Sequence, residues 1–334
     1  NWTTVSRLAL AVAWLGIAGS AVAGAATFSG TLTDRPDISD ADLSGCAAGT
    51  RLQESYDLIP FIGDTTGDYT IETTAAMGFP AVSDDTLLAL YDGTFAGGWS
   101  TNCIAVNDDS NGVLSSITTN LTAGQTYVAL VTYAWQTGDN GIGATYDGQI
   151  SGPGGVLFIE PFAGTLTDRP DILSASLFGC LAEGRLQESY DLIPFIVATS
   201  GTYTIETTAA AGFPNASDDT LLALFSPTFA GDWTTNCIAV NDDSTGFLSS
   251  ITTALTAGQT YVAVVTYAWQ GFGDGIGATF DGQISGPGRT TLGIFFDGFE
   301  SGDTSAWSAT APGIVPRPGP VPKPALVRGP KTAH

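Results

Sequence analysis

Short apolar runs along this chain alternate with clusters of Gly, Asp, Asn and Ser. Residues 69–73 (YTIET) and 127–135 (YVALVTYAW) place aromatic, aliphatic or β-branched side chains at every second position. This spacing is typical of half-buried strands, and the small polar clusters are typical of turns. No segment carries a helical stripe. The pattern predicts eight strands near residues 26–32, 55–62, 68–74, 86–91, 102–107, 113–119, 126–135 and 142–150. The expected fold is all-β, an antiparallel jelly-roll-like β-sandwich.

The same pattern occurs twice. Phe28–Gly154 aligns without a gap with Phe162–Gly288 at an offset of 134, and 29 of the 127 aligned positions differ. Each copy is large enough to enclose its own core. We therefore expect two tandem sandwich domains, 27–154 and 162–291. Because the linker 155–161 is short and partly apolar, we expect the two domains to touch.

The two ends of the chain differ from the copies. Leu8–Ala26 is an apolar run that follows Arg7 and contains Ala21-Val22-Ala23, which is typical of a cleaved secretory signal peptide. We assign 1–26 to this signal and predict a secreted, extracellular protein with no other membrane span; an N-terminal membrane anchor is the alternative. A short segment, 292–310, follows the second copy. The Pro-rich tail 311–334 is expected to be extended and to lack a core.

The excess of acidic over basic residues argues against several classes of function. Ten Lys and Arg against 33 Asp and Glu give a net charge of −23. Such a chain is poorly suited to nucleic acid or to an anionic membrane surface. The single histidine is His334, and both lysines lie in the same tail. Histidine-dependent triads, Schiff-base chemistry and His-ligated zinc therefore lack their residues, so we predict a protein without enzymatic activity.

Cysteines occupy equivalent positions in the two copies. Their even number in an exported chain predicts disulfides, with free buried thiols as the alternative. Of the three pairings, the duplication favours one bridge inside each copy, because a single domain must have closed its own. The expected bridges are Cys46–Cys103 and Cys180–Cys237.

Acidic clusters stand at predicted strand boundaries in both copies. Calcium binds six to eight oxygen atoms, which carboxylates, amides and carbonyls in such turns can supply. Plain turn formation is the equal alternative, and a glycosidase carboxylate pair is a weaker one. The candidate calcium ligands are Asp84, Asp85, Asn107, Asp108 and Asp109, with Asp218, Asp219, Asn241, Asp242 and Asp243 in the second copy.

Few other side chains offer chemistry. Each copy carries two arginines among acidic residues, expected to form structural ion pairs or to anchor carbonyl groups; they are Arg35, Arg51, Arg169 and Arg185. Four tryptophans could stack on sugar rings, although core packing is the favoured interpretation; they are Trp99, Trp135, Trp233 and Trp269.

Each copy resembles the bacterial pre-peptidase C-terminal domain. The resemblance is carried by Ser55–Ile62, Tyr69–Glu72, Asp84–Asp92, Ile104–Ser110 and Leu121–Val128, and in the second copy by Asp218–Phe225, Ile238–Ser244 and Leu255–Val262. It implies non-catalytic jelly-roll sandwiches of exported proteins, some of which bind calcium and some extracellular polymers. The chain departs from that pattern because no catalytic domain is attached to the copies.

Together these features predict a secreted, non-catalytic bacterial protein that holds calcium and binds an extracellular polymer or cell-surface partner. A carboxylate-only hydrolase and a structural surface protein without a ligand are the alternatives.

Overall fold

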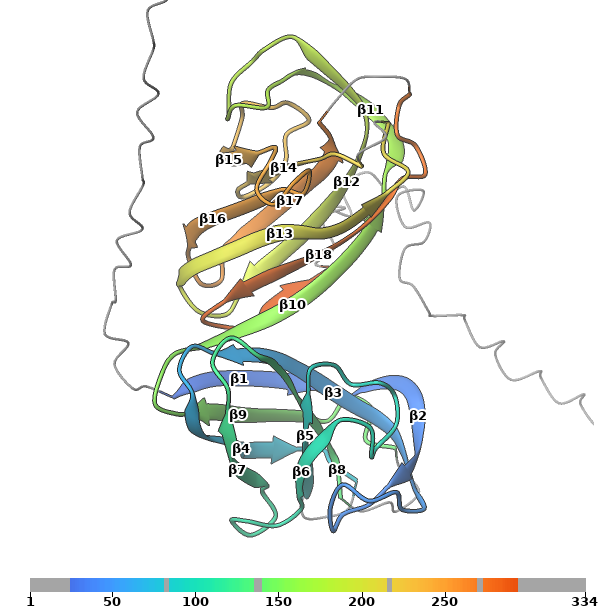
Figure 1. Cartoon of the computed structure of the whole chain (residues 1–334), viewed down its shortest axis with the longest axis vertical. Helices are drawn as coiled ribbons and strands as arrows, with labels where there is room; N and C mark the ends of the chain where they lie inside the picture. Colours follow the sequence, from blue (N-terminus) through green and yellow to red (C-terminus); the bar gives the residue numbers. More distant parts are fainter. Residues whose placement is uncertain (1–24, 81–83, 135–139, 215–217, 269–272, 294–334) are drawn as a thin grey trace, which may run out of the picture. The chain divides into compact units, whose positions relative to one another are not determined.

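A computed structural model describes residues 25–80, 84–134, 140–214, 218–268 and 273–293. Every regular element in these ranges is a strand, which confirms the all-β prediction (Figure 1). The first repeat contains β1 (Ala26–Thr31), β2 (Thr33–Ala41), β3 (Arg51–Gly63), β4 (Gly67–Met77), β5 (Thr86–Asp92), β6 (Cys103–Asn107), β7 (Ser116–Leu121), β8 (Thr126–Tyr133) and β9 (Thr145–Ser151). Then follow β10 (Val156–Thr165), β11 (Thr167–Ala175), β12 (Arg185–Val197), β13 (Gly201–Ala211), β14 (Thr220–Phe225), β15 (Cys237–Asn241), β16 (Ser250–Leu255), β17 (Thr260–Tyr267), β18 (Thr279–Gly286) and β19 (Thr290–Leu292).

Each repeat consists of two antiparallel layers. In the first repeat, β1-β9-β4-β7 form one layer and β3-β8-β5-β6 the other, with β2 paired to β3. The second repeat has the equivalent orders β10-β18-β13-β16 and β11-β12-β17-β14-β15. The antiparallel β-sandwich predicted from the alternation is thus present twice, whereas the jelly-roll assignment stays a prediction.

Strand β10 belongs to both repeats. Its first residues, Val156–Phe158, pair with Phe61–Gly63 of β3, and Phe158–Thr165 pair with β18. The segment that the sequence indicated as a linker is therefore part of a strand. It makes one layer of each repeat continuous with a layer of the other, and the described residues belong to one compact unit.

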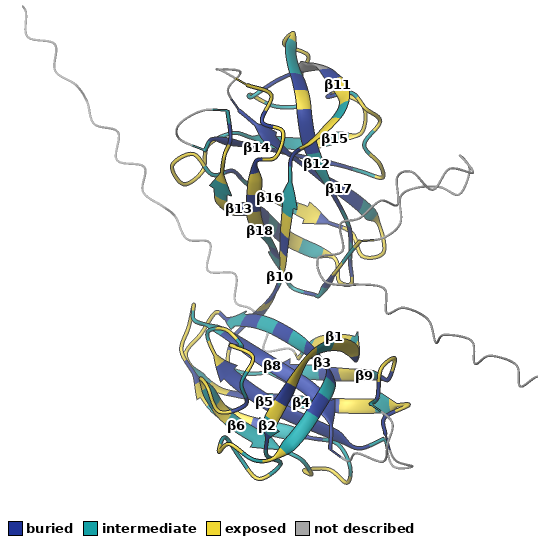
Figure 2. Ribbon diagram, turned by 90° about the vertical axis from the view of Figure 1, so that its right-hand side faces the viewer, coloured by how far each residue is buried: buried dark blue, intermediate teal, exposed yellow. Residues whose placement is uncertain are grey.

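Each repeat has two apolar clusters rather than one. The larger fills the space between its layers, around residues such as Phe61, Tyr69 and Leu90. The smaller lies on the opposite face of β3, β5 and β8, where β2 and the loop after β5 cover it with Ile38 and Trp99. Figure 2 shows β5 and β8 largely buried. Burial on both faces explains their nearly continuous apolar sequences, which lack simple alternation.

The alternation did not reveal β2. Its sequence, TDRPDISDA, is mostly polar and contains Pro36, which cannot donate to a ladder. Its pairing with β3 shifts register twice, between Asp34 and Ile38 and between Ile38 and Ala41. Only Ile38 and Ala41 are buried, so two apolar contacts hold a strand whose local sequence favours a loop.

Both disulfides join the cysteines predicted from the duplication, Cys46 to Cys103 and Cys180 to Cys237, 57 residues apart in each repeat. The described residues contain no helix that is long and apolar enough to cross a membrane. Ala26, the last residue of the predicted signal, begins β1. Residues 1–24 and 294–334, with most of the predicted signal, the C-terminal segment and the tail, lie outside the described residues.

Candidate metal centre

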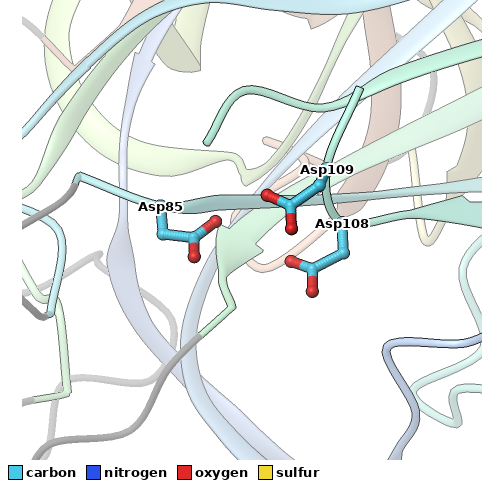
Figure 3. Close-up of side chains that lie close together, drawn as sticks. All are labelled: Asp85, Asp108 and Asp109. Atoms are coloured by element: carbon cyan, nitrogen blue, oxygen red, sulfur yellow. The ribbon is translucent and has the colours of Figure 1, made fainter. Parts of the chain in front are cut away.

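Antiparallel pairing brings the two acidic clusters of each repeat together. Leu88 of β5 is opposite Asn107 of β6, so the start of β5 lies beside the end of β6. Asp85 directly precedes β5, and Asp108 and Asp109 directly follow β6. One carboxylate oxygen from each lies within 4.8 Å of the other two (Figure 3). Residues more than 20 positions apart in the chain thus form one group.

The second repeat contains the same group. Asp219 precedes β14, Asp242 and Asp243 follow β15, and their oxygens meet the same 4.8 Å limit. We call the two groups the acidic triads. In each, the residue before the strand is buried, the next is half-buried and the last is exposed. A cation could therefore enter from solvent while contacting a carboxylate inside the fold.

The other predicted ligands have structural tasks. The Asn107 side-chain oxygen accepts a bond from the Ser116 amide at 2.8 Å, and Asn241 does the same for Ser250. Asp84 accepts from the amide of Phe79 at 3.0 Å and has a positive φ of 49°. Asp218 repeats that contact with Phe213. These four residues shape the turns, as the plain-turn alternative expects, and they stand outside the triads.

Hydroxyl groups fix the turn that carries two members of each triad. Ser115 Oγ lies 2.6 Å from the carbonyl oxygens of both Asp108 and Thr86, which ties the end of β6 to the start of β5. Ser249 makes the same links to Asp242 and Thr220. The triad backbone is therefore held in place before any ligand binds, which lowers the entropy cost of binding.

The electrostatic environment disfavours three negative charges in so small a space. Burial, followed by repulsion from Asp242 and Asp243, raises the pKa of Asp219 to about 6. Burial and repulsion from Asp243 likewise raise the pKa of Asp242 to about 6. In the first repeat, burial and Asp109 raise the pKa of Asp108. A bound cation would relieve both the repulsion and the loss of hydration.

Several triad oxygens are buried without a hydrogen-bond donor. The Oδ1 atoms of Asp108, Asp219 and Asp242 are in this position. A buried acceptor without a partner is costly, and most native structures avoid it. In the same two turns the neighbouring amides of Ser116 and Ser250 are satisfied by side-chain oxygens.

An arginine distant in sequence lies near each triad. The positive charge of Arg51 offsets part of the rise in the pKa of Asp108. That of Arg185 offsets part of the rise at Asp219 and Asp242. The Arg51 guanidinium also donates to the carbonyl of Ala134, one of the two roles expected for these arginines. The sequence showed only that Arg51 stands among acidic residues and did not indicate its proximity to the triad. The signal that bore on it was the predicted Cys46–Cys103 bridge, which ties the loop before β3 to the start of β6.

The remaining arginines form the expected ion pairs. Arg35 lies 3.7 Å from Asp57, and Arg169 lies 3.3 Å from Asp191. Each also donates through Nε to a β3 or β12 carbonyl oxygen, that of Tyr56 or Tyr190.

The two tryptophans in the described part of the chain are buried and present no stacking surface to a ligand. Trp99 is fully buried and its Nε1 donates to the Gly45 carbonyl at 3.0 Å. Trp233 is 1% exposed and donates to the Ser176 carbonyl. Both belong to the smaller apolar clusters, so ligand stacking is wrong for these two. Trp135 and Trp269 lie outside the described residues.

A small polar pocket of about 200 Å³ adjoins the triad turn of the first repeat. Most of its lining side chains carry hydroxyl groups. The lining residues are Glu72, Thr73, Thr74, Ser110, Asn111, Leu114, Ser115 and Ser116.

Comparisons with known proteins leave the family open. No protein-family model and no curated protein matches the chain. Among solved structures, an Arthrobacter globiformis T6 isomalto-dextranase complexed with panose is similar at 15% identity and a TM-score of 0.22. Tripeptidyl peptidase 2 is similar at 9% identity and a TM-score of 0.20. The alignments cover 72% and 79% of this chain but 37% and 23% of those proteins.

Proposed function

We propose that each repeat binds one calcium ion through its acidic triad. The observation that carries the proposal is the duplicated triad, in which buried carboxylate oxygens without donors converge on one point. All three side-chain ligands are oxygen donors, which favours a hard cation over zinc. Three carboxylates can supply up to about six oxygens, close to the number calcium prefers, with water completing the shell.

The charge of the site suits a divalent ion. Three carboxylates beside one arginine carry a formal charge of −2 when all are ionised. Calcium neutralises that charge, whereas a monovalent ion leaves half of it. Magnesium is disfavoured because it retains its water shell and seldom enters an all-protein cage.

Calorimetric titration of the full chain with CaCl2 tests this proposal. We expect two sites per chain, one after Asp219→Asn, and none after Asp85→Asn and Asp219→Asn together. Asp147→Asn removes the same charge from an exposed position and should leave both sites unchanged. Absence of calcium heat in the wild-type chain, or retention of both sites in the double variant, would refute the proposal.

We further propose that the protein is a secreted, non-catalytic pair of modules that binds an extracellular polymer or surface partner. The two intramolecular disulfides support an oxidising location. The hydroxyl-lined pocket beside the first triad supports a polar, hydroxyl-bearing ligand. The resemblance to pre-peptidase C-terminal domains agrees with both roles.

Co-sedimentation with collagen fibrils, chitin and cellulose tests the adhesive role, each in calcium and in EDTA. We expect retention on one polymer that EDTA weakens. A chain that is retained on none of them would support the ligand-free surface protein instead. Glycoside turnover that Asp109→Asn abolishes would establish the carboxylate-only hydrolase.

A further inference from the structure

Arg289 crosses from the second repeat to the first. It follows β18, and its Nη1 donates to Asp57 Oδ2 at 2.7 Å and to the Ser29 carbonyl at 3.2 Å. Its Nη2 donates to the Leu58 carbonyl at 3.4 Å. The two charged side chains are 19% and 9% exposed, so this ion pair is largely removed from water. Breaking one partner of such a pair leaves a buried charge uncompensated, which is strongly unfavourable.

Three further groups surround this ion pair. The Tyr146 hydroxyl donates to Asp57 Oδ2 at 2.7 Å, and Arg35 lies 3.7 Å from Asp57 Oδ1. Glu160 of the shared strand β10 lies 3.9 Å from Arg289 Nη2. Arg289 therefore lies between Asp57, to which it donates a hydrogen bond, and Glu160, which it contacts only at 3.9 Å.

Within the aligned copies, the second repeat keeps the carboxylate of this cluster but not its tyrosine. At the offset of 134, Gly155 corresponds to Arg289, Phe280 to Tyr146 and Ala26 to Glu160. Asp191 corresponds to Asp57 and forms an ion pair with Arg169 of its own repeat. Tyr146 is thus a difference within the aligned copies, whereas Arg289 and Glu160 stand just outside them, where the chain joins the two repeats.

We propose that Arg289 and Asp57 form a clasp that couples the two repeats into one cooperative unit, with Glu160 as its proton-sensitive member. The shared strand β10 supplies the backbone connection, and the clasp fixes the chain after β18 against β3. The equivalent position in the first repeat is Gly155, which offers no such donor.

Protonation of Glu160 favours the closed clasp. Burial, with a smaller contribution from Asp57, raises the pKa of Glu160 to about 7 against the opposing charges of Arg289 and Arg35. The closed clasp therefore keeps a proton that a hydrated glutamate, with a pKa of 4.5, would release. The closed form is favoured at acid pH and weakens as the pH rises through about 7. The closed-to-open ratio falls by at most about 300-fold across this range.

Calorimetry of the full chain in EDTA at about pH 5, where the clasp is closed, tests the coupling. The ratio of calorimetric to van't Hoff enthalpy is about one for a single cooperative unit and about two for two equal independent units. We expect about one for the wild type and about two for Arg289→Gly, which introduces the residue of the first repeat. Asp57→Asn should uncouple the repeats, whereas the matched Asp191→Asn should not. A wild-type ratio of two, or an Arg289→Gly ratio of one, would overturn the clasp.

A distance measurement tests the proton dependence without unfolding the chain. Spin labels at the exposed, equivalent positions Ile142 and Ile276 report the separation of the repeats. We expect a narrow distribution at about pH 5 and a broader one at about pH 8, and Glu160→Gln should stay narrow at both. Since Asp219 and Asp242 titrate near pH 6, only the difference between wild type and Glu160→Gln is assigned to Glu160. Equal broadening in both proteins, or none in the wild type, would refute this role.

Discussion

Asp219→Asn should change the stability of the second repeat in opposite directions with and without calcium. Asp219 is 4% exposed, and its pKa is raised from 3.8 to about 6 by burial and by its two acidic neighbours. In metal-free protein above that pH, the ionised carboxylate therefore opposes folding. A rise of this size corresponds to about 3 kcal/mol, which solvent screening at this turn reduces to about 1–2 kcal/mol. Asparagine keeps the shape and removes the charge.

The sign follows from proton linkage. Because the pKa is higher in the folded state, the folded chain binds more protons than the unfolded one between about pH 4 and pH 6. Metal-free wild type thus loses stability as the pH rises through about 6, and Asp219→Asn should lose less. At about pH 8 in EDTA we expect the variant to melt roughly 3–6 °C higher.

Calcium should reverse this order. At about 100 times its dissociation constant, a ligand stabilises the folded state by about 2.7 kcal/mol per site. The wild-type second repeat gains this stability, whereas the variant has lost a ligand and gains little. Scanning calorimetry in EDTA and in CaCl2, with Asp147→Asn as the charge control, measures both effects. An Asp219→Asn chain that is less stable than wild type in EDTA, or equally responsive to calcium, would refute the electrostatic account of the triad.

Three further predictions concern the disulfide, the buried tryptophan and the arginine beside the triad. Replacing Cys46 and Cys103 together by alanine should destabilise the first repeat by about 4 kcal/mol in urea, and unchanged unfolding would show that the bridge contributes little. Trp99→Ala should cost about 3–5 kcal/mol of stability, and a variant that melted like wild type but lost polymer retention would restore the ligand-stacking role. Arg185→Gln removes a positive charge near the second triad and should tighten calcium binding about two- to tenfold by calorimetric titration; weaker binding would mean that Arg185 positions the ligands.

The sequence predicted much of the local structure because its signals are local. Period-two spacing indicated β4, and short apolar runs between turn residues indicated β5 and β8, since exposure of one face or burial of both leaves a readable pattern. Strand β2 was not predicted, because backbone pairing interrupted by two register shifts, with two buried residues, leaves no alternation in its sequence.

The sequence predicted the type of candidate site but not which residues form it. Acidic clusters at two strand boundaries indicated a cation site, and the register between β5 and β6 selected which carboxylates meet. Asp84 and Asn107 have the same chemistry as the triad members in sequence. Their side chains bond backbone amides instead, which depends on turn geometry that only the folded chain has.

By itself the sequence determined the duplication, the all-β class, the disulfide pairing and the scarcity of catalytic side chains. Each of these follows from residue identity, from the two-residue alternation or from the repeat at an offset of 134. Tertiary structure alone decided that β10 serves both repeats, that Trp99 is core, and that Arg51 and Arg289 lie beside acids distant in sequence. Such contacts depend on strand order and register, and antiparallel pairing can place any two distant segments side by side.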